Sequence, residues 1–125
     1  MSKKRHILIV EDEVFLADAY KEALAGKGYE VSDVRNGLEA LKWLKKETAD
    51  LILLDLIMPK MTGFEFLEEL KRLKHHAHVP VIVLTNLGQE KDREVCDSFG
   101  RCHYLIKTEV SLDDIVKEIG KSFSK

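Results

Sequence analysis

The sequence is short of the features that mark specialised protein classes. Of its 125 residues only two are cysteine and two proline, and the 22 acidic residues nearly balance the 20 basic ones. The net charge of −2 gives no positive field that would gather nucleic acid, so we expect no direct nucleic-acid binding. The longest apolar runs, such as residues 51–54, are far shorter than the ~20 residues of a membrane span. We therefore expect no membrane-crossing segment.

The first residues and the cysteines indicate an intracellular protein. The chain starts with basic residues, but the apolar run at 7–10 is too short for a signal peptide, so we expect a cytoplasmic location. Cys96 and Cys102 have no second pair to complete a zinc site. We expect both thiols to be reduced, because a disulfide requires an oxidising compartment.

A cluster of histidines precedes Pro80. His75, His76 and His78 have the composition of a metal site, but their position after a helical segment and before a proline is typical of an exposed loop. We expect the exposed loop rather than a metal site.

Short apolar runs alternate with segments of helical length. The strand-sized runs are residues 7–10, 31–34, 51–54, 81–84 and 104–106. Between them, apolar residues recur at spacings of three and four, and Ser111 with Asp114 predicts the start of the last helix. Strict alternation of strand and helix requires parallel strands joined by right-handed crossovers. The sequence therefore predicts one α/β domain over residues 1–125, a (βα)5 doubly wound five-stranded parallel sheet, with no output domain attached.

Polar residues follow four of the five predicted strands. They are Glu11 and Asp12 after the first, Asp55 after the third, Thr85 after the fourth and Lys107 after the fifth. The carboxyl ends of parallel strands meet at one edge of the sheet, which is where such folds place their functional groups. Carboxylates gathered there repel one another unless a cation lies between them, and hard oxygen ligands favour Mg²⁺. We expect a magnesium site at this edge.

The segment after Asp55 has a distinctive pattern. It continues Leu-Ile-Met-Pro-Lys-Met-Thr-Gly and ends at Gly63, which resembles the phosphorylation-site signature of response-regulator receiver domains. The acidic pair, the strand-end threonine and the strand-end lysine occur in matching order, so the resemblance spans the whole chain. It implies a stand-alone, chemotaxis-receiver-like phosphorelay module with a flavodoxin-like fold and the strand order 2-1-3-4-5.

The resemblance also implies roles for individual residues. Asp55 would accept a phosphoryl group from a sensor histidine kinase or a histidine phosphotransfer protein, so the chain would be a self-phosphorylating switch and not a turnover enzyme. Mg²⁺ would be held by Glu11, Asp12, Asp55 and the backbone carbonyl of Ile57. Lys107 would pair with Asp55 and then with the phosphoryl group, and Thr85 would donate its hydroxyl to that group.

Signal output would follow from rearrangement at the surface. By the resemblance, Tyr104 rotates as Thr85 moves inward, and the change reaches the surface of residues 89–99 and 104–123. A downstream protein or a second copy of the chain would bind there. The sequence departs from the family where Thr108 follows Lys107 in place of proline, and we expect a trans peptide at this position because a non-proline cis bond costs ~3 kcal/mol.

Three alternatives are compatible with parts of the pattern. A pseudo-receiver would keep the fold as a phosphorylation-independent interaction module, but the acidic pair, Asp55, Thr85 and Lys107 are all intact. An aspartate-nucleophile, Mg²⁺-dependent phosphatase typically has a second aspartate two residues after the first, where this chain has Ile57. A nucleotide or flavin site needs a glycine-rich turn after the first strand, and this turn is acidic.

Overall fold

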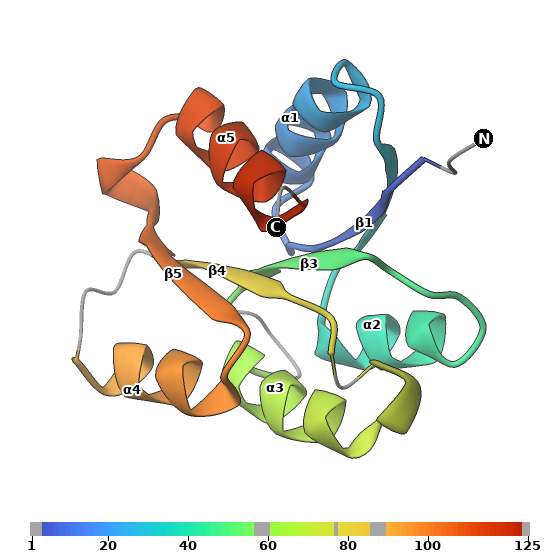
Figure 1. Ribbon diagram of the computed structural model, residues 1–125, viewed down its shortest axis with the longest axis vertical. Coiled ribbons are helices and arrows are strands. Elements are labelled where there is room, and N and C mark those ends of the chain that lie inside the picture. The colour runs from blue at the N-terminus through green and yellow to red at the C-terminus, as the bar shows by residue number, and fades with distance from the viewer. Residues whose placement is uncertain (1–3, 57–60, 77, 86–89, 124–125) are drawn as a thin grey trace.

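Five parallel strands form the centre of the computed structural model, which describes residues 4–56, 61–76, 78–85 and 90–123 (Figure 1). The strands are β1 (His6–Val10), β2 (Glu30–Val34), β3 (Leu51–Asp55), β4 (Val81–Thr85) and β5 (Cys102–Ile106). They lie in the order β2-β1-β3-β4-β5, and each neighbouring pair is parallel. The predicted fold class and the strand order that the resemblance implied are both confirmed.

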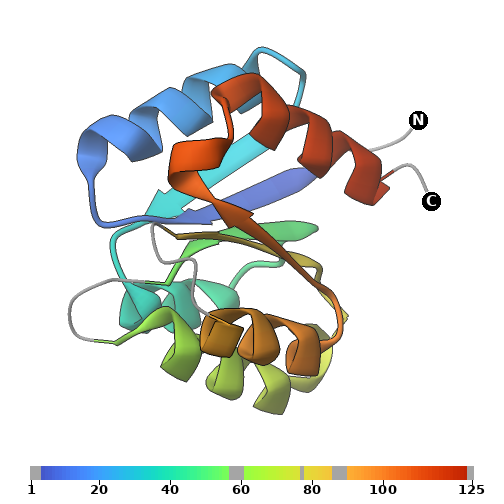
Figure 2. The same ribbon diagram turned by 90° about the vertical axis from the view of Figure 1, so that its left-hand side faces the viewer.

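Helices cover both faces of the sheet. They are α1 (Val14–Ala25), α2 (Gly37–Leu44), α3 (Gly63–Arg72), α4 (Glu90–Phe99) and α5 (Leu112–Phe123), with short 3-10 turns η1 (Lys74–His76) and η2 (Lys107–Glu109). Helices α1 and α5 lie on one face and α2, α3 and α4 on the other, as Figures 1 and 2 show. In the part of the chain that the structure describes, no helix is long and apolar enough to cross a membrane.

Burial explains why the strands could be located from the sequence. Strands β3 and β4 are buried along their whole length, and β1 is buried from its second residue on. A strand with helices on both faces has no solvent side, so its sequence is a continuous apolar run rather than an alternation. Two buried clusters result, one under α1 and α5 and the other under α2, α3 and α4.

Side-chain caps fix the starts of α3 and α5. The Thr62 hydroxyl accepts from the Glu65 backbone N–H at 3.2 Å, and the Glu65 carboxylate accepts from the Thr62 N–H at 2.9 Å. Ser111 and Asp114 exchange the same pair of bonds at 3.1 and 2.9 Å. The capping box predicted at Ser111 is confirmed, and each cap satisfies backbone donors that a helix leaves unpaired.

The prediction of reduced cysteines is wrong for this structure. Cys96 in α4 and Cys102 at the start of β5 form a disulfide, with their Cα atoms 5.3 Å apart. The chain reverses between them at Gly100, whose φ of 96° lies in the left-handed region that favours glycine. This turn folds β5 back beside α4 and brings the two sulfurs together.

The prediction of an exposed histidine loop is wrong for His76. Turn η1 directs His76 inward, where it is 5% exposed and its Nε2 lies 2.8 Å from the backbone carbonyl oxygen of Leu44. His75 and His78 are exposed, as expected. His76 therefore joins η1 to the end of α2, through a backbone carbonyl that has no partner within the helix.

Candidate functional site

Strand register brings the predicted acidic residues together. Val10 of β1 is paired with Leu54 of β3, so Glu11 and Asp55 emerge side by side at the carboxyl edge of the sheet. Both carboxylates are buried, with exposed fractions of 2% for Glu11 and 8% for Asp55, while Asp12 is exposed. Oxygen atoms of the three carboxylates lie within 4.8 Å of one another. Adjacent parallel strands therefore converge on a compact acidic cluster.

Lys107 reaches the same cluster from β5. Its Nζ lies 3.1 Å from Glu11 Oε1 and 3.2 Å from Asp55 Oδ2. The side chain is only 15% exposed, so its charge is shielded from water. No described peptide bond is cis, so the predicted trans bond after Lys107 is confirmed. The lysine thus lies between two carboxylates, whereas the resemblance implied a pairing with Asp55 only.

The acidic cluster has more negative than positive charge. Burial, followed by the nearby Asp55 carboxylate, raises the pKa of Glu11 to about 7, although Lys107 opposes this. Burial lowers the pKa of Lys107, but the attraction of Asp55 and Glu11 together outweighs it, so this pKa is raised overall. One ammonium therefore faces two buried carboxylates, with Asp12 beside them. The surplus negative charge is a physical reason for a cation to bind.

The donor set fits Mg²⁺. The resemblance to receiver domains implies this ion, and the carboxylates of Glu11, Asp12 and Asp55 supply the hard oxygen ligands that it prefers. Asp12 is exposed, which leaves room for the waters that Mg²⁺ retains. The backbone carbonyl of Ile57, the further ligand implied by the resemblance, lies outside the described residues.

Thr85 and Tyr104 lie on the strands next to the cluster. Thr85 is the last residue of β4, has no exposed surface, and is paired in register with Ile106, the residue before Lys107. Tyr104 is half-buried on β5 and packs against the cluster under α2, α3 and α4. The guanidinium of Arg93 in α4 lies 5.0 Å from the centre of the Tyr104 ring. This contact between α4 and β5 was not foreseen from the sequence.

Gly63 has a structural role that the motif alone did not explain. A Cβ atom at this position would lie 2.6 Å from the Cα of Leu56, and the Gly63 N–H donates to the Leu56 carbonyl at 2.9 Å. The first residue of α3 therefore lies against the backbone that follows Asp55. Glycine permits that close approach, which holds the end of β3 in place.

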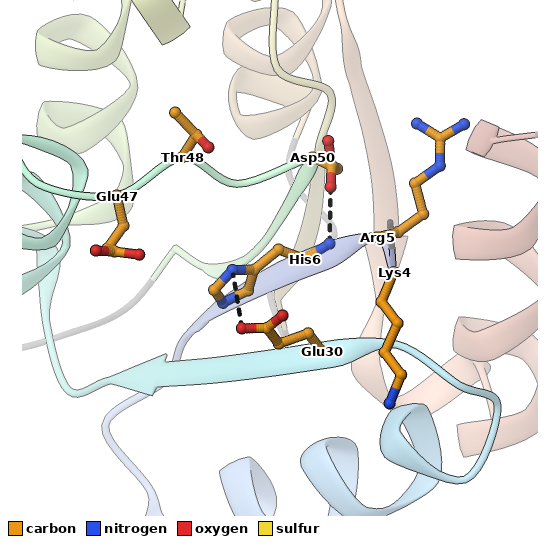
Figure 3. Close-up of a pocket in the computed structure, with 7 residues that line it drawn as sticks. All are labelled: Lys4, Arg5, His6, Glu30, Glu47, Thr48 and Asp50. Atoms are coloured by element: carbon orange, nitrogen blue, oxygen red, sulfur yellow. Dashed lines mark hydrogen bonds and ion pairs between the residues drawn. The ribbon is translucent and has the colours of Figure 1, made fainter. Parts of the chain in front are cut away.

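A separate polar pocket of about 640 Å³ lies at the opposite edge of the sheet (Figure 3). Two of its carboxylates lie against His6. Asp50 accepts from the His6 backbone N–H at 2.7 Å, and Glu30 lies 3.8 Å from His6 Nδ1. His6 begins β1 and Glu11 follows its end, so the pocket is remote from the acidic cluster. We interpret these pairs as ties between the starts of three strands.

Comparison with known proteins agrees with the geometry. The response regulator receiver domain model matches residues 7–120. The chain is 39% identical over 102 residues to the "probable transcriptional regulator ycf29" of Porphyra purpurea, covering 82% of this chain and 49% of that protein. It is 31% identical over 115 residues to the "polar-differentiation response regulator DivK" of Brucella anthropi, covering 92% and 93%.

A solved structure gives the same result for the fold. The chemotaxis protein CheY4 of Vibrio cholerae is 26% identical and superposes with a TM-score of 0.89, covering 97% of this chain and 100% of that one. The chain spans about half of the length of several curated relatives that it matches. The similarity to those proteins is therefore confined to one of their parts.

Proposed function

The chain belongs to the response regulator receiver domain family, whose members are phosphoacceptor switches of two-component signalling and not turnover enzymes, and we propose that Asp55 is its phosphoacceptor. The observation that carries this assignment is the position of Asp55 in the acidic cluster. Its carboxylate is at the end of β3, within bonding reach of Lys107 and beside the carboxylates of Glu11 and Asp12. A nucleophile beside an ammonium group is suited to attack on an anionic phosphoryl group.

In the proposed reaction an oxygen of Asp55 attacks the phosphorus of a phosphohistidine. The P–N bond breaks, the histidine nitrogen leaves with the bonding electrons, and an acyl phosphate forms on Asp55. Mg²⁺, held by Glu11, Asp12 and Asp55, would neutralise charge on the phosphoryl oxygens. Lys107 lies 3.2 Å from Asp55, so its ammonium can move to a phosphoryl oxygen with little displacement.

The proposed output begins at Thr85. Its hydroxyl, at the end of the neighbouring strand, would donate to the phosphoryl group and draw the end of β4 inward. Tyr104 lies in the adjacent strand and contacts Arg93 of α4, so a change at Thr85 has a short route to the α4–β5–α5 surface. A downstream protein or a second copy of the chain would bind that surface.

The phosphoryl donor is proposed to be a sensor histidine kinase or a histidine phosphotransfer protein, and the compartment the cytoplasm. Receiver domains receive phosphoryl groups from such donors, and one matched relative is a hybrid signal transduction histidine kinase B of Dictyostelium discoideum. The nearly neutral charge balance of the chain does not favour direct binding to nucleic acid.

Incubation with acetyl phosphate and Mg²⁺ tests the assignment. We expect the intact mass to increase by one phosphoryl group in the wild type and not in Asp55→Asn. Asp18→Asn is the matched control, because Asp18 is an exposed aspartate of α1 and should leave labelling unchanged. Chelation of Mg²⁺ with EDTA should prevent labelling. Phosphorylated Asp55→Asn protein would show that the acceptor is a different residue.

A further inference from the structure

The Cys96–Cys102 disulfide joins the two elements that the proposed switch would move. Cys96 lies in the second half of α4 and Cys102 is the first residue of β5, six positions later in the chain. Tyr104 lies two residues further along the same strand and contacts Arg93 of α4. The covalent link therefore spans the same α4–β5 junction as the proposed route from Thr85 to the surface.

Cys96 is a buried point of contact between α4 and the rest of the molecule. Among the α4 side chains that the structure describes, Cys96 is the buried one, at 2% exposed, and Phe99 is partly buried. The sulfur bridge adds a covalent tether to β5 at this buried point, so breaking the bridge should loosen the attachment of α4 to β5.

We propose that Cys96 and Cys102 form a reversible redox site, reduced by thiols, whose disulfide restrains α4 and weakens the response to phosphorylation. This inference rests on the proposed function. It also rests on the compartment proposed there, because disulfides of cytosolic proteins are typically transient and redox-sensing. A permanent structural bridge would be unusual at such a site, whereas a reversible one can couple the thiol pool to the switch.

The surroundings of Cys102 indicate which sulfur is attacked. Cys102 is partly exposed while Cys96 is buried, so an external thiolate reaches Cys102 more readily. Cys102 also lines a pocket of about 800 Å³ with the charged side chains of Arg101, Lys121 and Glu118. Arg101 and Lys121 outnumber Glu118 by one positive charge, which favours an anionic thiol reductant over a neutral or cationic one.

The exchange balances without any further reagent. A thiolate bonds to the sulfur of Cys102 and breaks the bridge, and Cys96 leaves as a thiolate that takes a proton. A second thiolate attacks the outer sulfur of the mixed disulfide, releasing the oxidised reductant and a Cys102 thiolate that is protonated in turn. Two thiols are oxidised to one disulfide as the protein bridge is reduced to two thiols, and the reverse exchange restores the bridge.

Thermodynamic linkage makes the coupling measurable from both sides. If the bridge disfavours the phosphorylated conformation, a phosphoryl mimic must bind the reduced protein more tightly than the oxidised protein. By the same factor, protein with the mimic bound must be easier to reduce. Beryllofluoride with Mg²⁺ is a suitable mimic because it binds without requiring a kinase.

The test is a beryllofluoride titration of oxidised protein and of protein reduced with dithiothreitol, monitored by amide spectra. We expect the reduced protein to bind about five-fold or more tightly, with larger shifts in α4. Cys96→Ala/Cys102→Ala is the matched control and should behave like the reduced protein with or without dithiothreitol. Two results would overturn this inference and leave the proposed function intact. One is equal affinity for beryllofluoride in both redox states, and the other is the absence of a disulfide that dithiothreitol reduces. Failure of both states to bind the mimic would overturn the proposed function as well.

Discussion

Replacement of Lys107 by methionine tests the electrostatics of the acidic cluster. Methionine keeps much of the length and apolar volume of the lysine and removes its charge. In the wild type that charge lies 3.1 Å from Glu11 and 3.2 Å from Asp55, and both carboxylates are buried. Loss of one partner from a buried ion pair lowers the free energy of unfolding by about 3–5 kcal/mol when the remaining charge cannot be neutralised.

Here protonation of Glu11 can neutralise one of the two carboxylates. The pKa of Glu11 is already raised to about 7 in the presence of Lys107, so without the lysine it must rise further. A carboxyl group whose pKa is raised in the folded state loses stability as the pH rises from its unfolded pKa to its folded one. In the wild type that loss ends near pH 7. In Lys107→Met it continues to higher pH, so the variant and the wild type diverge above neutrality.

The expected magnitudes follow. Without Mg²⁺, we expect Lys107→Met to lower the free energy of unfolding by about 1–2 kcal/mol near pH 6, where Glu11 is protonated. Each pH unit above neutrality adds up to about 1.4 kcal/mol, giving a loss of up to about 3–4 kcal/mol near pH 8.5. Saturating Mg²⁺ should reduce the loss, because the cation substitutes for the ammonium.

Urea unfolding in EDTA at several pH values measures this directly, with Trp43 fluorescence or circular dichroism as the signal. Lys121→Met is the matched control, because the Lys121 side chain is 74% exposed and its Glu118 pair at 3.5 Å is worth little. A loss of stability that stays constant with pH would refute the coupling between Lys107 and Glu11.

Three further substitutions test other parts of the account. Gly63→Ala should lower the free energy of unfolding by about 1–3 kcal/mol, because its Cβ would lie 2.6 Å from the Leu56 backbone. The control Gly120→Ala, whose Cβ would have no neighbour closer than 4.0 Å, should be neutral or stabilising. Equal effects of the two substitutions in urea unfolding would contradict this. His76→Ala should cost about 1–3 kcal/mol through its lost hydrogen bond and packing, and exposed His75→Ala less than about 0.5. Thr85→Ala should still be phosphorylated, as intact mass would show, but with smaller amide shifts in α4; undiminished shifts would exclude Thr85 from the output route.

The strands of the sheet could be predicted because their burial determines a pattern within each short segment of the sequence. Each central strand is covered on both faces, so each is a continuous apolar run, and alternation with amphipathic segments requires parallel pairing. The strand order came only from the resemblance to receiver domains, because composition and periodicity do not fix it. The position of the acidic cluster then followed, since Glu11 and Asp55 both end neighbouring strands.

Features that depend on contacts across turns were missed. The Cys96–Cys102 bridge depends on the reversal at Gly100, and the burial of His76 depends on how η1 meets the end of α2. The placement of Lys107 between two carboxylates depends on the full register of four strands. None of these follows from residue spacing, because each is set by where separate elements meet in space.

Direct chemical location of the phosphoryl group tests whether Asp55 is the phosphoacceptor. After phosphorylation with acetyl phosphate and Mg²⁺, borohydride reduction converts an aspartyl phosphate into homoserine, which tandem mass spectrometry of peptides can place. We expect homoserine at position 55 alone. Homoserine at position 12 or at another carboxylate, or none despite a phosphorylated intact mass, would contradict the assignment of Asp55 as the phosphoacceptor.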